Sequence, residues 1–168
     1  VQHKELVSMA ESRFSALAKG LEMNLNALAP KLEGIRFNER SFSNALQHLK
    51  LTENTCVLVF EGGRLKYWSD NKALPDTFNI INYEDERVYL LGNGYYYFKS
   101  KTVANRKLIA LLLIKHQYSL QNKYLDNVFH PALSLYKDVT ISLNSSTEGF
   151  SFKGPNQKEL FKLIFTDN

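Results

Sequence analysis

Residues 106–115, RKLIALLLIK, decide the fold. Within them, residues 108–114 are seven consecutive apolar residues, and on a strand they would alternate between the two faces of a sheet. A strand that is apolar on both faces is typical of the centre of a sheet that is covered on both sides. The run is also far shorter than the ~20 apolar residues that a membrane-spanning helix needs. We therefore expect a central strand here.

Two β-hairpins are predicted before this strand. In the nearer one, a Gly-Asn-Gly turn joins residues 87–91 to residues 95–101, and Asn-Gly is a typical pair in tight hairpin turns. In the farther one, the valine-rich apolar run at residues 55–60 leads through a Glu-Gly-Gly-Arg turn to alternation over residues 65–69. An irregular stretch, residues 70–82, separates the hairpins. The order predicts an antiparallel sheet.

Two helices are expected before the sheet. Large apolar residues recur over residues 14–32 at spacings of three and four, which places them on one stripe of an α-helix. Pro30 and Gly34 indicate where this helix ends. A shorter helix is predicted over residues 41–49, with Ser41 as its N-cap.

The remainder of the chain is less regular. Residues 122–127 fit a short helix, and short strands are predicted over residues 139–143, 149–153 and 159–165. Together the elements predict an α+β fold. In it, a long N-terminal helix and a shorter helix pack on a central antiparallel sheet of about five strands, and a C-terminal extension contains further strands.

The length of 168 residues is comfortable for one domain and short for two. We expect a single domain over residues 1–168. It divides into a helical N-terminal segment (1–50), a core antiparallel sheet (55–116) and a C-terminal extension (117–168).

The charge is nearly balanced, with 21 lysines and arginines against 17 acidic residues and a net charge of +4. The densest basic patch consists of Lys99, Lys101, Arg106 and Lys107, around one predicted hairpin. Nucleic-acid-binding proteins usually have a clustered basic stripe, so we expect no nucleic-acid partner. We interpret the patch as a solvated sheet edge, where lysine discourages edge-to-edge pairing.

Catalytic patterns are missing from the sequence, and we expect no enzyme activity, metal or cofactor in this chain. The four histidines lack zinc-motif spacing, and neither GxSxG nor GxxxxGK[ST] occurs. Cys56 lies in an apolar run, where it reads as a small buried hydrophobic residue. The acidic cluster Glu84-Asp85-Glu86 lacks the alternating ligands of a calcium loop, so we interpret it as a solvated turn.

Aromatic residues are the unusual feature of the composition, with nine tyrosines, eleven phenylalanines and one tryptophan. Alternation places Tyr95, Tyr97 and Lys99 on one face of their strand. With Trp68, they are our candidate ligand-binding residues, because tyrosine and tryptophan combine a broad apolar face with a polar handle. The alternative is that these aromatic residues pack across neighbouring strands.

Several short segments together carry a family resemblance. They are LKYWSDN at 65–71, NGYY at 93–96, ALLLIKH at 110–116, YLDN at 124–127, FHP at 129–131 and a final strand near 160–165. They resemble the N-terminal sensor region of large membrane-bound histidine kinases of Bacteroidetes-type bacteria, a PAS/Cache-like module. The likeness spans most of the chain from about Leu17 onward.

The resemblance implies a periplasmic domain of an inner-membrane protein, with one membrane helix before Val1 and another after Asn168. The phosphorylated histidine and the ATP-binding domain of the kinase would follow on the cytoplasmic side. The chain itself would bind a small-molecule or protein signal, form a homodimer through its N-terminal helix, and transmit a helix displacement across the membrane.

Other functions remain open from the sequence. The same fold serves as the input domain of other transmembrane receptors, such as chemoreceptors, and only residues beyond Asn168 separate the two. A soluble PAS-like binding module is favoured if no apolar helix precedes Val1. An enzyme is a third alternative, which paired carboxylates in a pocket would support.

Overall fold

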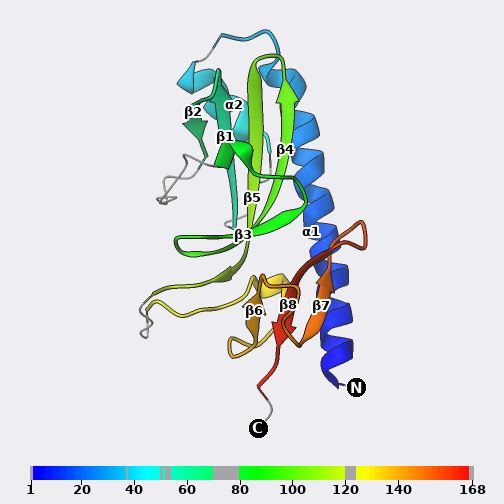
Figure 1. The fold of residues 1–168 in the computed structure, drawn as a ribbon. Coiled ribbons are helices and arrows are strands. Elements are labelled where there is room, and N and C mark those ends of the chain that lie inside the picture. Colours follow the sequence, from blue (N-terminus) through cyan, green and yellow to red (C-terminus); the bar gives the residue numbers. More distant parts are fainter. Residues whose placement is uncertain are drawn as a thin grey trace.

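Two antiparallel sheets lie one after the other along a single long helix (Figure 1). The computed structural model describes residues 2–36, 38–49, 51, 54–69, 80–119 and 124–166. In chain order, its elements are α1 (Gln2–Leu32), α2 (Glu39–Gln47), β1 (Thr55–Glu61), β2 (Arg64–Trp68), η1 (Ile80–Asn82), β3 (Arg87–Leu91), β4 (Gly94–Val103), β5 (Arg106–His116), η2 (Pro131–Leu133), β6 (Thr140–Ser142), β7 (Phe150–Lys153) and β8 (Glu159–Ile164). The predicted α+β fold is confirmed.

The larger sheet has the order β2-β1-β5-β4-β3, with β5 at its centre as predicted. Both neighbours of β5 are antiparallel to it: Ile109 pairs with Leu58 of β1, and Leu111 pairs with Phe98 of β4. Every residue from 108 to 114 is buried. Alternate residues belong to two different hydrophobic clusters, one on each face of the sheet. The apolar run is thus explained by burial on both faces.

The long helix α1 covers one of these faces. Its apolar stripe packs on β4 and β5, and it also contacts β7 of the smaller sheet, whose order is β6-β8-β7. Phe14 lies at the meeting point: its ring is edge-on to Tyr97 of β4 at 5.0 Å and to Phe152 of β7 at 5.6 Å. One hydrophobic cluster therefore extends from the larger sheet through α1 to the smaller sheet.

The opposite face of the larger sheet carries the second cluster. Cys56 is buried there at 8% exposure, as expected, and Ile80 of η1 covers part of this face. Tyr83 stacks on Tyr89 of β3 with ring centroids 3.9 Å apart. Most of the stretch predicted to be irregular, 70–82, lies outside the described residues.

Two local predictions for the helices are wrong. The N-cap of α2 is Asn38, not Ser41: the Asn38 side-chain oxygen accepts a hydrogen bond from the Ser41 backbone N–H at 3.1 Å. The predicted helix at 122–127 is not helical in its described part, residues 124–127. There the Asn127 side chain accepts a hydrogen bond from the backbone of Tyr118, nine residues earlier, which ties this segment to the end of β5.

The interpretation of the basic patch as a solvated sheet edge is also corrected. The β4–β5 hairpin lies inside the sheet, and Arg106 is only 7% exposed. Its guanidinium donates to the Leu32 carbonyl at the end of α1 (2.6 Å) and to Glu61 of β1 (2.8 Å). Lys101 donates to Asn26 of α1. Arg106 and Lys101 thus attach α1 to the larger sheet, because the β4–β5 hairpin runs beside the C-terminal part of α1.

Gly94 permits a close approach between β4 and β5, and this yields a stability prediction. A Cβ at Gly94 would lie 2.6 Å from both Leu113 Cδ1 and the Lys115 carbonyl oxygen, whereas a Cβ at Gly20 of α1 would meet nothing within 4 Å. We expect Gly94→Ala to lower the free energy of unfolding by about 1–3 kcal/mol. The control Gly20→Ala should raise it by about 0.5–1 kcal/mol, because alanine favours helix. Urea denaturation measures both, and an unchanged Gly94→Ala variant would contradict the packing described.

Candidate functional site

A cavity of about 310 Å³ lies where the start of α1 meets the C-terminal extension. Its volume falls at the lower end of the range of small-molecule pockets. The residues that matter for its chemistry are Glu5, Leu6 and Met9 of α1, Tyr136 and Asp138 of the loop after η2, and Phe165 just after β8. Three segments that are far apart in sequence thus form one site.

An aromatic contact lines the cavity. The His3 ring stacks on Phe165 with centroids 4.1 Å apart and an interplanar angle of 12°, and it is edge-on to Phe150 of β7. The first turn of α1 therefore touches the segment that follows the last strand. The described chain begins and ends at the same end of the molecule (Figure 1).

The loop wall of the cavity is attached to the centre of the larger sheet by Lys115 of β5. This side chain is 3% exposed, and its Nζ donates to the backbone carbonyls of Lys137 (3.0 Å) and Val139 (2.6 Å). The ammonium also lies 4.6 Å from the centroid of the Phe129 ring. Burial lowers the pKa of Lys115, while the nearby carboxylates act in the opposite direction. The two carbonyls and the ring offset part of the cost of burying this charge.

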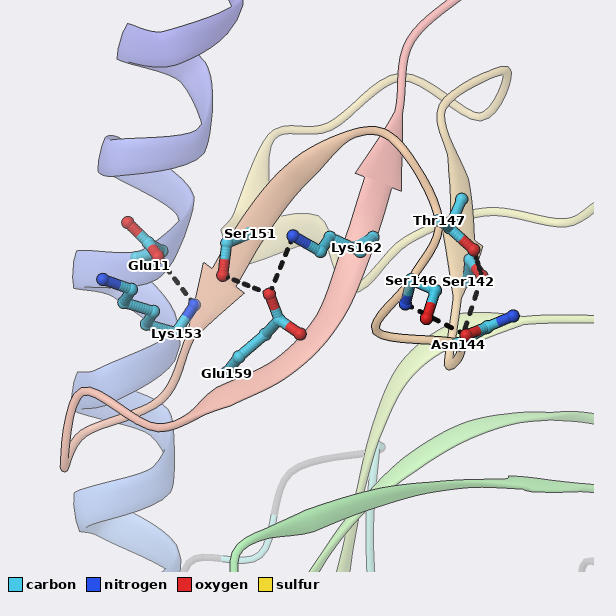
Figure 2. Close-up of polar contacts among 9 residues, drawn as sticks. All are labelled: Glu11, Ser142, Asn144, Ser146, Thr147, Ser151, Lys153, Glu159 and Lys162. Atoms are coloured by element: carbon cyan, nitrogen blue, oxygen red, sulfur yellow. Dashed lines mark hydrogen bonds and ion pairs between the residues drawn. The ribbon is translucent and has the colours of Figure 1, made fainter.

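Polar contacts attach the smaller sheet to α1 and brace it internally (Figure 2). The Lys153 backbone N–H at the end of β7 donates to the Glu11 carboxylate of α1 at 2.7 Å. Within the sheet, the Glu159 carboxylate accepts hydrogen bonds from Ser151 Oγ (2.6 Å) and Lys162 Nζ (3.0 Å), and these lower its pKa. The sheet that bears Phe165 is therefore fixed to the same helix that bears Glu5 and Met9.

Of the four predicted ligand-binding residues, the structure brings three to one face and leaves one apart. Tyr95, Tyr97 and Lys99 lie on the α1 face of β4, as the alternation predicted, with Tyr97 packed in the core at 1% exposure. Trp68 is 48% exposed on the edge strand β2. It pairs with Leu58, whose side chain belongs to the cluster on the opposite face.

Lys99 has an internal role in this arrangement. Its Nζ pairs with the Glu86 carboxylate at 3.2 Å, and the same oxygen accepts a hydrogen bond from Asn156 Nδ2 at 2.6 Å. These contacts, the Asn156 bond first, lower the pKa of Glu86. Through Glu86, the acidic turn at 84–86 thus links β4 to the turn after β7. Ligand binding by Trp68, Tyr95, Tyr97 and Lys99 stays a prediction, but none of the four lines the cavity.

The cavity residues were missed by sequence reasoning. Glu5, Met9 and Asp138 belong to no motif with a fixed spacing, and Phe165 read as the end of a strand. One feature gave a weak signal: Met9 is apolar but lies outside the stripe of α1 that packs on the sheet. Only packing of α1 against the extension makes these side chains neighbours.

Other reactive groups of the described chain serve the fold. His130 Nδ1 accepts a hydrogen bond from the Ala132 backbone N–H at the start of η2, and burial lowers the pKa of His130. Among the described residues, no group of three or more His, Cys, Asp or Glu side chains is placed to hold a metal ion.

Comparisons with known proteins found no match. No protein-family model matches the chain, and neither a curated protein nor a solved structure matches it significantly.

Burial of Tyr97 yields a prediction for alkaline pH. Burial, with the nearby acidic side chains as a smaller cause, raises the pKa of Tyr97 well above its usual value. Above about pH 10 the unfolded chain releases this proton and the folded chain retains it, so the free energy of unfolding falls by up to about 1.4 kcal/mol per pH unit. We expect Tyr97→Phe to remove this loss. Urea denaturation between pH 8 and 11 measures the difference, and identical pH profiles for the two proteins would refute it.

Proposed function

We propose that this chain is the extracytoplasmic sensor domain of a membrane-bound histidine kinase. The observation that carries the proposal is the stacking of His3 on Phe165 at 4.1 Å, because it places the incoming helix and the outgoing segment side by side. A domain inserted between two membrane helices needs its two ends close together at one end of the molecule. The segments that resemble such kinases, from LKYWSDN at 65–71 to the final strand, support the same assignment.

The topology of the larger sheet supports a PAS-like sensor. Its five strands, in the order β2-β1-β5-β4-β3 and antiparallel throughout, fit the central antiparallel sheet of about five strands that the resemblance implies. A long N-terminal helix along this sheet also fits the Cache-like variant of that fold.

The cavity gives the proposal a mechanism. α1 forms one wall, and the loop held by Lys115 and the segment after β8 form the others. A ligand or partner that binds better to one arrangement of these walls shifts the population toward it, by no more than its difference in binding free energy. The shift would then displace α1 relative to the segment after β8.

A homodimer through α1 is part of the proposal. Met9, Ala16 and Met23 are exposed and seven residues apart, so they lie along one side of the helix, away from the core. Met9 is 51% exposed and Met23 is 62% exposed, which is unusual for large apolar side chains. Such a stripe suits pairing with the same helix of a second copy.

The membrane attachment would lie outside the described residues. Within them, no helix has both the length and the apolar character that crossing a bilayer requires.

The first test is to read the coding sequence beyond both ends of this chain. We expect an apolar stretch of ~20 residues on each side, followed downstream by a helix with the phosphorylated histidine and by asparagine- and glycine-rich ATP-binding boxes. If apolar stretches flank the chain but a different output domain follows, the protein is another transmembrane receptor and not a histidine kinase. A natural protein that begins near Val1 and stops near Asn168 would overturn the proposal and leave a soluble binding module.

The second test concerns the dimer. We expect Met23→Glu to weaken self-association at least about tenfold, because like charges would face each other across the two-fold axis. Ser8→Glu is the matched control, since Ser8 is exposed on α1 but roughly a quarter of a turn away from Ala16. Sedimentation equilibrium measures the dissociation constants. If both variants weaken self-association equally, the exposed stripe is not the interface. If the wild-type chain is monomeric, the α1 dimer is refuted.

A further inference from the structure

We propose that the cavity between α1 and the C-terminal extension binds a small organic cation, an ammonium group joined to a compact apolar body. The binding itself depends only on the geometry of the cavity. Its consequence for signalling rests on the proposed sensor function.

Charge is the first argument. The cavity walls include two carboxylates, Glu5 and Asp138, and no lysine or arginine. Within the described part of the chain, neither carboxylate forms an ion pair. Asp138 is held in place by the hydroxyl of Thr166, which donates to its Oδ2 at 3.1 Å. A ligand cation would therefore find oriented negative charge that no protein cation neutralises by direct contact.

Neither the buried Lys115 nor the N-terminus of α1 cancels the negative charge of the cavity. Lys115 lies behind the loop wall, with Nζ committed to two backbone carbonyls, so it does not line the cavity. The first turn of α1 carries partial positive charge, and Glu5 lies in that turn and offsets it.

Exposed apolar surface is the second, independent argument. Tyr136 is 69% exposed and Met9 is 51% exposed, and both line the cavity together with Phe165. Aromatic faces attract organic cations, and the flexible thioether of methionine adapts to the shape of an apolar group. Carboxylates beside exposed aromatic and thioether surface match an amphipathic amine better than a metal ion or an anion. The volume of about 310 Å³ limits the apolar body to a single small ring or a short chain.

A ligand in this position would touch every wall that the proposed mechanism moves. Met9 lines the cavity and also belongs to the exposed stripe of α1. A ligand bound in the cavity would therefore contact a residue of the proposed dimer interface. Bound amine would hold the start of α1 against the loop at 136–139 and the segment after β8. It would favour the arrangement in which His3 and Phe165 are stacked.

The test uses benzylammonium chloride as the probe, with benzyl alcohol and sodium benzoate as neutral and anionic matches at equal ionic strength. Titration of the isolated chain, followed by NMR shifts of the Met9 methyl group, should show saturable binding of benzylammonium alone. We expect Glu5→Gln and Asp138→Asn each to weaken it roughly threefold to fivefold, as for partly exposed charge pairs. The matched control Glu22→Gln, exposed on α1 outside the cavity, should leave it unchanged.

Three results would overturn the inference: no saturation, equal binding of the alcohol or benzoate, or equal effects of Glu22→Gln and the cavity variants. Asp138→Asn alters the hydrogen bond with Thr166 and could unfold the chain. In that case the Glu5→Gln variant, whose side chain is exposed, provides the test. Because the chain is titrated without flanking segments, amine binding and the sensor proposal fail separately. If benzylammonium binds but the gene encodes no flanking membrane helices, the amine site stands and the proposed sensor function is refuted.

Discussion

The edge-on packing of Phe14 against Tyr97 and Phe152 is the contact on which the rest of the structure depends. It joins α1, the larger sheet and the smaller sheet at one fully buried point. Aromatic side chains bury more area than any others, and the edge-to-face arrangement adds a directional preference. Since α1 is attached to both sheets here, neither sheet can shift relative to the other without repacking this helix.

Polar side chains complete the attachment, and most of them act across long distances in sequence. Arg106 ties the end of α1 to the larger sheet, Glu11 holds the end of β7, and Lys115 holds the loop at 137–139. The ends of α1 are thus fixed by different partners. The cavity lies at the end where the attachment is aromatic and partly exposed, so this is where a bound molecule can compete with the packing of the protein itself.

The predicted ligand residues show where pattern reasoning reaches its limit. Alternation placed Tyr95, Tyr97 and Lys99 on one face, and that face is the one α1 covers, so Tyr97 is core and Lys99 pairs with Glu86. The packing alternative holds for Tyr97, which contacts Phe14. A period of two distinguishes the faces of a strand, but it does not say which face meets a helix, a ligand or water.

The sequence by itself determined the elements whose signals are local: the buried run at 108–114, the Asn-Gly hairpin before it, the apolar stripe of α1 and the α+β order of helices and strands. Each follows from spacings within a few residues, which backbone geometry imposes directly. Only the tertiary structure decided the cavity and its supports. Lys115 meets carbonyls 22 and 24 residues away, and Arg106 meets one 74 residues away. Such contacts depend on how whole elements pack, and no local period encodes them.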